Sequence, residues 1–211
     1  MNKQQNYHEA AAHGFSAAQS HGTVRTASER TKKLVTIAML CAVAYVVMVL
    51  IHLKLMPAAP YLTYDPKDVI ITIGGFLFGP LYALLISVIV AFLEMITVSD
   101  SGIIGFFMQV IATLAFAGTA SLIYRGRHTK SGAVLGLVLG TVLMVIVMLL
   151  WNYILTPLYL GTPRTEVVKL LAPVILPFNL IKGFLNSAIL LMIYKPIVGA
   201  LRRSGLVNER K

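Results

Sequence analysis

Apolar residues occur in six long runs, and short polar or Gly/Pro-containing stretches separate them. The runs are Leu34–Ile51, Pro66–Phe78, Leu81–Ile96, Ile103–Tyr124, Ala133–Leu155 and Leu170–Tyr194. A helix that crosses a bilayer needs about 20 apolar residues, with a range of about 17–25. The pattern therefore predicts an all-α membrane protein with six transmembrane helices.

The second run is predicted to be a short helix. Asp65 is a good N-cap and Pro66 a good first helical residue, whereas Gly79 and Pro80 end the run. Such a helix is only about 20 Å long, less than the bilayer core of about 30 Å. Short membrane helices are tolerated where they line a cavity.

Prolines are predicted to mark the ends of the last two helices. The fifth run is expected to end at Pro157, and the sixth carries Pro173 and Pro177 in its first turns.

The chain before the first run is polar. Residues 1–33 are rich in Ala, Gln, Ser and His and contain no apolar stretch. We expect a disordered or weakly helical cytoplasmic extension, in which His8, His13 and His21 are solvated. Residues 34–203 are expected to form the six-helix transmembrane domain, and residues 204–211 a short basic cytoplasmic tail.

Composition excludes most soluble folds. Apolar residues make up 57% of the 211 residues and charged residues 12%, against about 45–50% and about 25% in soluble domains. The single cysteine, Cys41, cannot form an internal disulfide. The net charge of +10 would suggest nucleic acid in a soluble protein, so the positions of the charges matter.

The basic residues predict the orientation. With the N-terminus in the cytoplasm, 13 Lys and Arg residues fall inside, and Lys182 lies within the sixth run. The four outside are Lys54, Lys67, Arg164 and Lys169. The excess of basic residues on one side predicts that both termini are cytoplasmic. It also accounts for the positive net charge without a nucleic-acid partner.

Polar side chains within the runs converge on the outer half of the bundle. They are Glu94, Gln109, Asn152, Asn179 and Lys182, with Asp65 and Asp68 expected at the rim. Intramembrane ionisable residues usually mark function, so we predict an outward-facing ligand pocket. Glu94 could instead snorkel to the interface, and the asparagines could be interhelical hydrogen-bond partners.

The residue types favour a neutral, planar heteroaromatic ligand. Asn179, Lys182 and Asn186 share one helix face because they are three and seven residues apart. Carboxamides both donate and accept hydrogen bonds. Flat apolar surface is expected from Trp151, Tyr153, Phe106, Phe107 and Phe178.

Two further patterns concern packing and chemistry. Gly132, Gly136 and Gly140 form a double GxxxG pattern that is typical of close helix packing. The sequence contains no P-loop, HExxH, CxxC or GxSxG motif. We therefore expect neither ATP hydrolysis nor enzyme activity from this chain.

Several stretches resemble the substrate-binding (S) components of energy-coupling factor (ECF) vitamin transporters, and among them the riboflavin-specific members. The most specific runs from Pro177 to Gly183, with Asn179 and Lys182 inside it. Others are Tyr64–Val69, Phe78–Leu81, Glu94 with Gly102–Gly105, Trp151–Tyr153 and Ala38-x-x-x-Ala42. Pro66 and Lys67 depart from the usual residues between the two aspartates.

The resemblance implies roles for these residues. Asn152, Asn179 and Lys182 would hold the pyrimidine edge of the isoalloxazine ring, with Glu94 and Gln109 near the ribityl hydroxyls. Ala38 and Ala42 would dock on a transmembrane coupling subunit, which works with two ATPase subunits. Riboflavin would be the transported ligand rather than a catalytic cofactor. An S component for thiamine or a folate, or a small membrane protein of non-transport function, remains open.

Overall fold

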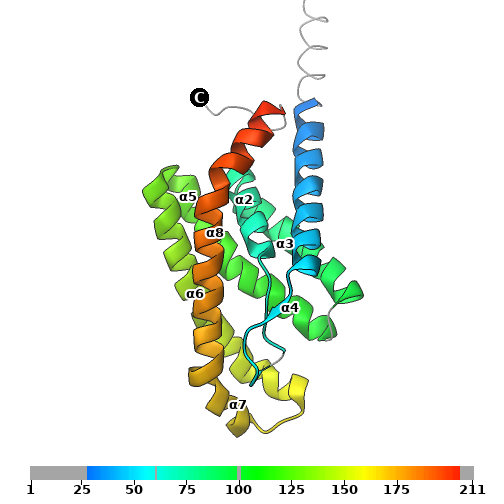
Figure 1. Ribbon diagram of the computed structural model, residues 1–211, viewed down its shortest axis with the longest axis vertical. Helices are drawn as coiled ribbons and strands as arrows, with labels where there is room; N and C mark the ends of the chain where they lie inside the picture. Colours follow the sequence, from blue (N-terminus) through cyan, green and yellow to red (C-terminus); the bar gives the residue numbers. More distant parts are fainter. Residues whose placement is uncertain (1–27, 60, 99–100, 205–211) are drawn as a thin grey trace, which may run out of the picture.

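The computed structural model describes residues 28–59, 61–98 and 101–204, which form a helical bundle with one small hairpin (Figure 1). A helix at Ser28–Leu50 leads into the hairpin of β1 (Leu53–Lys54) and β2 (Thr63–Tyr64). The remaining elements are α2 (Lys67–Phe78), α3 (Pro80–Thr97), α4 (Gly102–Thr113), η1 (Leu114–Gly118), α5 (Thr119–Arg127), α6 (Lys130–Leu160), α7 (Arg164–Leu170), η2 (Leu171–Ile175) and α8 (Leu176–Arg203).

Five helices of the described ranges are long and apolar enough to cross a membrane. They are Ser28–Leu50, Pro80–Thr97, Gly102–Arg127, Lys130–Leu158 and Arg164–Ala200. They correspond to five of the six predicted runs. The remaining run, the second, forms the 12-residue α2, whose first ten residues are all buried. The short helix is thus enclosed by the longer ones, as Figure 1 also shows.

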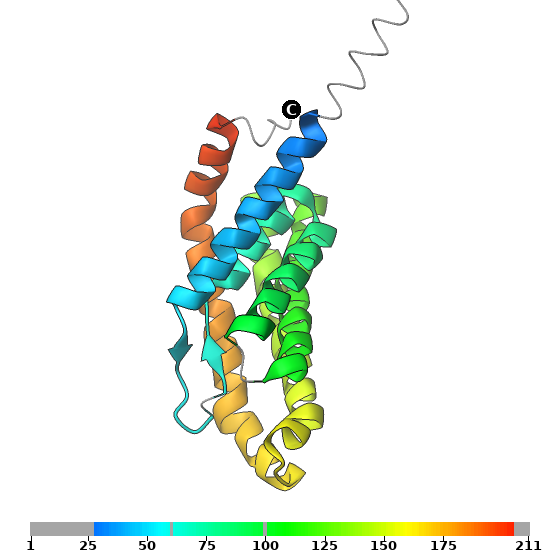
Figure 2. The same ribbon diagram turned by 90° about the vertical axis from the view of Figure 1, so that its right-hand side faces the viewer.

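The first helix begins earlier than its apolar run. Residues 28–33, assigned above to the extension, are already helical. Residues 1–27, with the three histidines, and residues 205–211 lie outside the described residues. The helix begins at the same end of the bundle where α8 ends (Figures 1 and 2).

The prediction that the fifth helix ends at Pro157 is wrong. Helix α6 continues through Pro157 to Leu160, and Gly161 ends it in the left-handed conformation with φ 63°. A proline costs a helix one backbone hydrogen bond. Because Pro157 stands so close to the end, the carbonyl that loses its partner lies in the last turns, and little of the helix follows the missing bond.

The last span, which corresponds to the sixth apolar run, also starts before its predicted first residue, Leu170. It begins at Arg164 and continues through α7, η2 and α8, so Pro173 lies inside it. Pro173 falls in the π-helical turn η2. A π turn shifts hydrogen bonds to residues five apart, which leaves room for a proline that lacks an N–H and crowds the preceding turn.

The GxxxG pattern serves packing inside the protein. A Cβ atom on Gly136 would lie 2.8 Å from the carbonyl oxygen of Ala120, and one on Gly140 would lie 2.5 Å from that of Phe116. Both distances are shorter than van der Waals contact. Helix α6 therefore approaches η1 and α5 as closely as its glycines allow, in agreement with the prediction.

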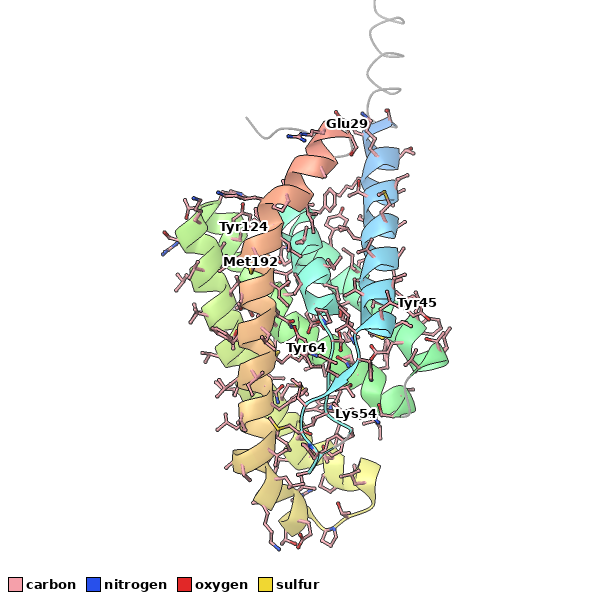
Figure 3. The ribbon with its side chains drawn as sticks, in the orientation of Figure 1. Glu29, Tyr45, Lys54, Tyr64, Tyr124 and Met192 are labelled. Atoms are coloured by element: carbon pink, nitrogen blue, oxygen red, sulfur yellow. The ribbon has the colours of Figure 1, made fainter. Side chains whose placement is uncertain are left out.

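The connection between the first helix and α2 folds back on itself. Leu53 pairs with Tyr64 and Lys54 with Thr63 in the antiparallel hairpin. The hairpin lies beyond the end of the first helix and beside α8 (Figure 2). It thereby brings Tyr64 and the residues that follow into the centre of the bundle, where Figure 3 labels Tyr64.

Candidate functional site

A cavity of about 150 Å³ lies between the hairpin and helices α3, α4, α6 and α8. Four of the predicted site residues line it: Glu94, Gln109, Asn179 and Lys182. The hairpin segment adds His52, Lys54 and Tyr61–Thr63, and α6 adds Met148 and Thr156. Residues far apart in the chain thus converge on one space, as expected from their depths in the apolar runs.

Five charged side chains form a chain of alternating sign beside this cavity. Lys67 Nζ bonds to Glu94 Oε2 and lies 3.4 Å from Asp65 Oδ2. Lys182 Nζ lies 3.7 Å from the same Asp65 oxygen and 3.5 Å from Asp68 Oδ2. The order is Glu94, Lys67, Asp65, Lys182 and Asp68. None of the five residues is more than 6% exposed.

Neutral hydrogen-bond donors contact the carboxylates at both ends of this chain of alternating charges. At one end Thr113 donates to Asp68 Oδ1 at 2.6 Å, and Asn186 Nδ2 donates to Asp68 Oδ2 at 3.4 Å. At the other end Gln109 Nε2 donates to Glu94 Oε1 at 3.4 Å. Because buried polar groups are costly without partners, these donors satisfy carboxylate oxygens that the lysines leave free or share.

The residues just before α2 respond to this environment. Burial disfavours the ionised form of Asp65, but Lys67 and Lys182 outweigh it, so the pKa of Asp65 lies below its usual value. Burial raises the pKa of Tyr64, which keeps its hydroxyl neutral. That hydroxyl donates to Asn186 Oδ1 at 3.1 Å.

The structure corrects the expected positions of three charged residues. Asp65 and Asp68 are fully buried rather than placed at a rim, and Lys67 is 1% exposed rather than an exterior loop cation. One signal was available in the sequence. Lys67 stands between two aspartates at the start of a strongly apolar helix, where a partner for its charge is needed.

The two predicted asparagines occupy different positions. Asn179 lines the cavity, and its Nδ2 donates to the Ile175 carbonyl at 2.8 Å, which leaves Oδ1 as an acceptor for a ligand. Asn152 is fully buried behind the lining. Its Nδ2 donates to the Met148 carbonyl at 2.8 Å, and its Oδ1 accepts from Thr156 at 2.8 Å.

The expected aromatic surface is present in part. Phe106 and Phe178 line the cavity, together with Tyr61, which the sequence did not single out. Phe107 and Tyr153 are exposed instead and do not line it. Flat apolar groups thus flank the polar wall formed by α8 and α3.

The predicted docking residues lie on the outside of the bundle. Ala38 and Ala42 are both exposed, one helical turn apart on the first helix. Exposed large apolar residues adjoin them, among them Val35 and Val46. This face is smooth and apolar, suited to lipid or to another membrane helix.

Similar proteins are known. The family model of the ECF transporter, substrate-specific component, matches residues 32–194. Riboflavin transporter RibU of Staphylococcus aureus (strain TCH60) is 30% identical over 182 residues, which cover 83% of this chain and 95% of that protein. Riboflavin transporter FmnP of Bacillus subtilis (strain 168) is 31% identical, over 78% of this chain and 91% of that protein.

The fold has a solved counterpart as well. The structure of the S component of a bacterial ECF transporter superposes with a TM-score of 0.70 and 31% sequence identity, covering 82% of this chain and 98% of that one. The family match spans most of the chain, including every residue of the cavity described above. This chain belongs to the family of ECF transporter substrate-specific components.

Proposed function

We propose that this protein is the riboflavin-binding S subunit of an ECF-type, ATP-driven importer in a bacterial cell membrane. One observation carries the proposal: Glu94, Gln109, Asn179 and Lys182 meet in one cavity, in a chain whose relatives are riboflavin transporters. The family is a transporter component, so the cavity serves capture and release rather than chemistry.

The polar wall suits a flavin ring. The pyrimidine edge of isoalloxazine presents a carbonyl, an N–H and a second carbonyl in a row. Asn179 offers a carboxamide oxygen and Lys182 an ammonium donor on the same helix face. Phe106 and Phe178 would contact the ring faces, and Glu94 and Gln109 the ribityl hydroxyls.

Asn152 contributes to the same site from behind the lining. Its carboxamide fixes the hydroxyl of Thr156 and the carbonyl of Met148, both residues of the cavity wall. Its role in flavin binding is thus to hold this wall in place.

The remaining elements of the proposal concern orientation and partners. The excess of basic residues on one side supports cytoplasmic termini, and in that orientation the cavity would face the exterior. The exposed Ala38 and Ala42 face would dock on a transmembrane coupling subunit that acts with two ATPase subunits. Their small side chains let another helix approach closely.

Purified protein tests the ligand directly. Riboflavin retained through purification would give visible absorbance, and titration of ligand-free protein with riboflavin would show saturable binding. Thiamine and folate serve as competitors. A colourless protein that binds either competitor but not riboflavin would contradict the proposal.

A further inference from the structure

The chain of alternating charges contains one more carboxylate than ammonium group. Glu94, Asp65 and Asp68 carry three negative charges, and Lys67 and Lys182 carry two positive ones. All five residues are almost fully buried. Asp65 is shared, because both ammonium groups approach its Oδ2.

The two lysines hold different positions relative to the cavity. Lys182 lines it, whereas Lys67 is absent from the lining and bridges Glu94 on α3 to Asp65 before α2. Lys67 therefore balances the charges of two carboxylates without contacting the ligand space. Without it, Lys182 would be the single ammonium beside the three buried carboxylates of this cluster.

We infer that Lys67 is a positioning residue of the ligand site, which fixes the Glu94 carboxylate at the cavity wall and leaves Lys182 able to donate to the ligand. This inference rests on the proposed function for its ligand. The contacts of Lys67 carry it: the bond to Glu94, and the sharing of Asp65 with Lys182. An isolated charge in a buried site is costly, so removing Lys67 shifts Glu94, Lys182 or both.

Replacement of Lys67 by methionine keeps the length of the side chain and removes its charge. We expect Lys67→Met to bind riboflavin at least about tenfold more weakly than wild type, a loss of about 1.4 kcal/mol. The matched control is Lys169→Met, which breaks the exposed pair with Glu166 and should leave affinity unchanged. Circular dichroism and size exclusion of ligand-free protein in detergent check that each variant is folded.

A charge-balanced double variant separates positioning from mere packing. Lys67→Met/Glu94→Gln removes one ammonium and one carboxylate, so the net charge of the cluster returns to its original value. If Lys67 acts through Glu94, the double variant binds riboflavin no more weakly than Glu94→Gln alone. This comparison also holds if Lys67→Met by itself does not fold.

The pH dependence of stability gives a second measurement, which needs no ligand. In Lys67→Met one buried carboxylate is expected to take a proton in the folded state, so the melting temperature should fall by several degrees from about pH 5.5 to about pH 8. The other titratable groups of this cluster are Asp65, Asp68, Glu94 and Lys182, with Tyr64 next to it and His52 and Lys54 on the cavity lining. Wild type and the double variant have the same net charge in this cluster, with one carboxylate more than ammonium groups, so neither should show this additional slope.

The outcomes are distinct. Wild-type affinity in Lys67→Met, or fully additive losses in the double variant, would overturn the positioning role. An unchanged pH profile of Lys67→Met would overturn the charge balance. Wild-type protein that binds no riboflavin would overturn the proposed function and the ligand part of this inference, while the melting profiles would still decide on the charge chain.

Discussion

The hydroxyl of Tyr64 donates a 3.1 Å hydrogen bond to Asn186 Oδ1, across 122 positions of sequence. The side chain of Asn186 also contacts Asp68, because its Nδ2 donates to that carboxylate. This pair ties the end of the hairpin to α8, directly beside the charge chain.

Loss of this bond should destabilise the protein. Tyr64→Phe leaves a buried carboxamide oxygen without its donor, which costs about 1–3 kcal/mol. Thermal unfolding in detergent measures the loss. Tyr45→Phe is the matched control, because its hydroxyl bond to Thr97 is exposed and its removal should cost less than about 0.5 kcal/mol. Equal melting temperatures for the two variants would contradict this view of Tyr64.

Asn179 is expected to contact the ligand. Asn179→Ala removes a carboxamide from the cavity lining. The polar edge of the bound flavin would then lack a hydrogen-bond partner, which should weaken binding by about 1–3 kcal/mol. Isothermal titration with riboflavin measures the affinity of the variant. Unchanged affinity would remove Asn179 from the site.

Lys182 is expected to matter for both binding and folding. Lys182→Met should weaken riboflavin binding by about 1–3 kcal/mol and also lower stability, because Asp65 and Asp68 each lose an ammonium partner. Binding and melting measured on the same preparation distinguish these effects. A variant with wild-type values in both measurements would contradict the role of Lys182.

The docking face can be tested apart from the cavity. Ala38→Trp/Ala42→Trp should abolish uptake in proteoliposomes that contain the coupling subunit and ATPases, because indoles prevent close helix approach. Riboflavin binding by the isolated subunit should stay unchanged. Val43→Trp, an exposed position on another face of the same helix, is expected to transport normally. Normal uptake by the Ala38/Ala42 variant would refute the docking assignment.

The glycines of α6 allow a packing test. Gly140→Ala places a Cβ 2.5 Å from the Phe116 carbonyl oxygen and should destabilise by about 1–3 kcal/mol. Gly199→Ala is the control, since a Cβ there would meet no atom of the described residues within 4 Å beyond its own helical turn. Alanine at this position should be neutral or slightly stabilising, by up to about 1 kcal/mol. Similar melting temperatures for both variants would contradict the close contact of α6 with η1.

Hydropathy predicted the long spans well because a bilayer imposes a length that an apolar run must match. It misplaced the end of the fifth helix, which continues past Pro157, and the start of the sixth, which lies before Leu170. A proline can be accommodated within a helix near its terminus or in a π turn. Neither arrangement can be recognised from the pattern of apolar residues.

The candidate site was predictable to the level of which residues converge. Glu94, Gln109, Asn179 and Lys182 could be identified because polar groups inside apolar runs are rare. The burial of Lys67 could not be derived from the charge count, which treats every lysine near the end of a run as a loop residue. Asp65 is a close neighbour of Lys67 in the sequence, but Glu94 comes from a separate helix that meets Lys67 only in the folded chain.

The hairpin belongs to the same covalent segment that leaves the proposed docking helix. Between Leu50 and Lys67 this segment supplies His52, Lys54 and Tyr61–Thr63 to the cavity, and its last residues enter the charge chain. Because only a few residues separate the first helix from the cavity wall, a tilt of that helix would displace the wall. Binding of a partner to the exposed face of the first helix and release of the ligand from the cavity would then be coupled through this segment.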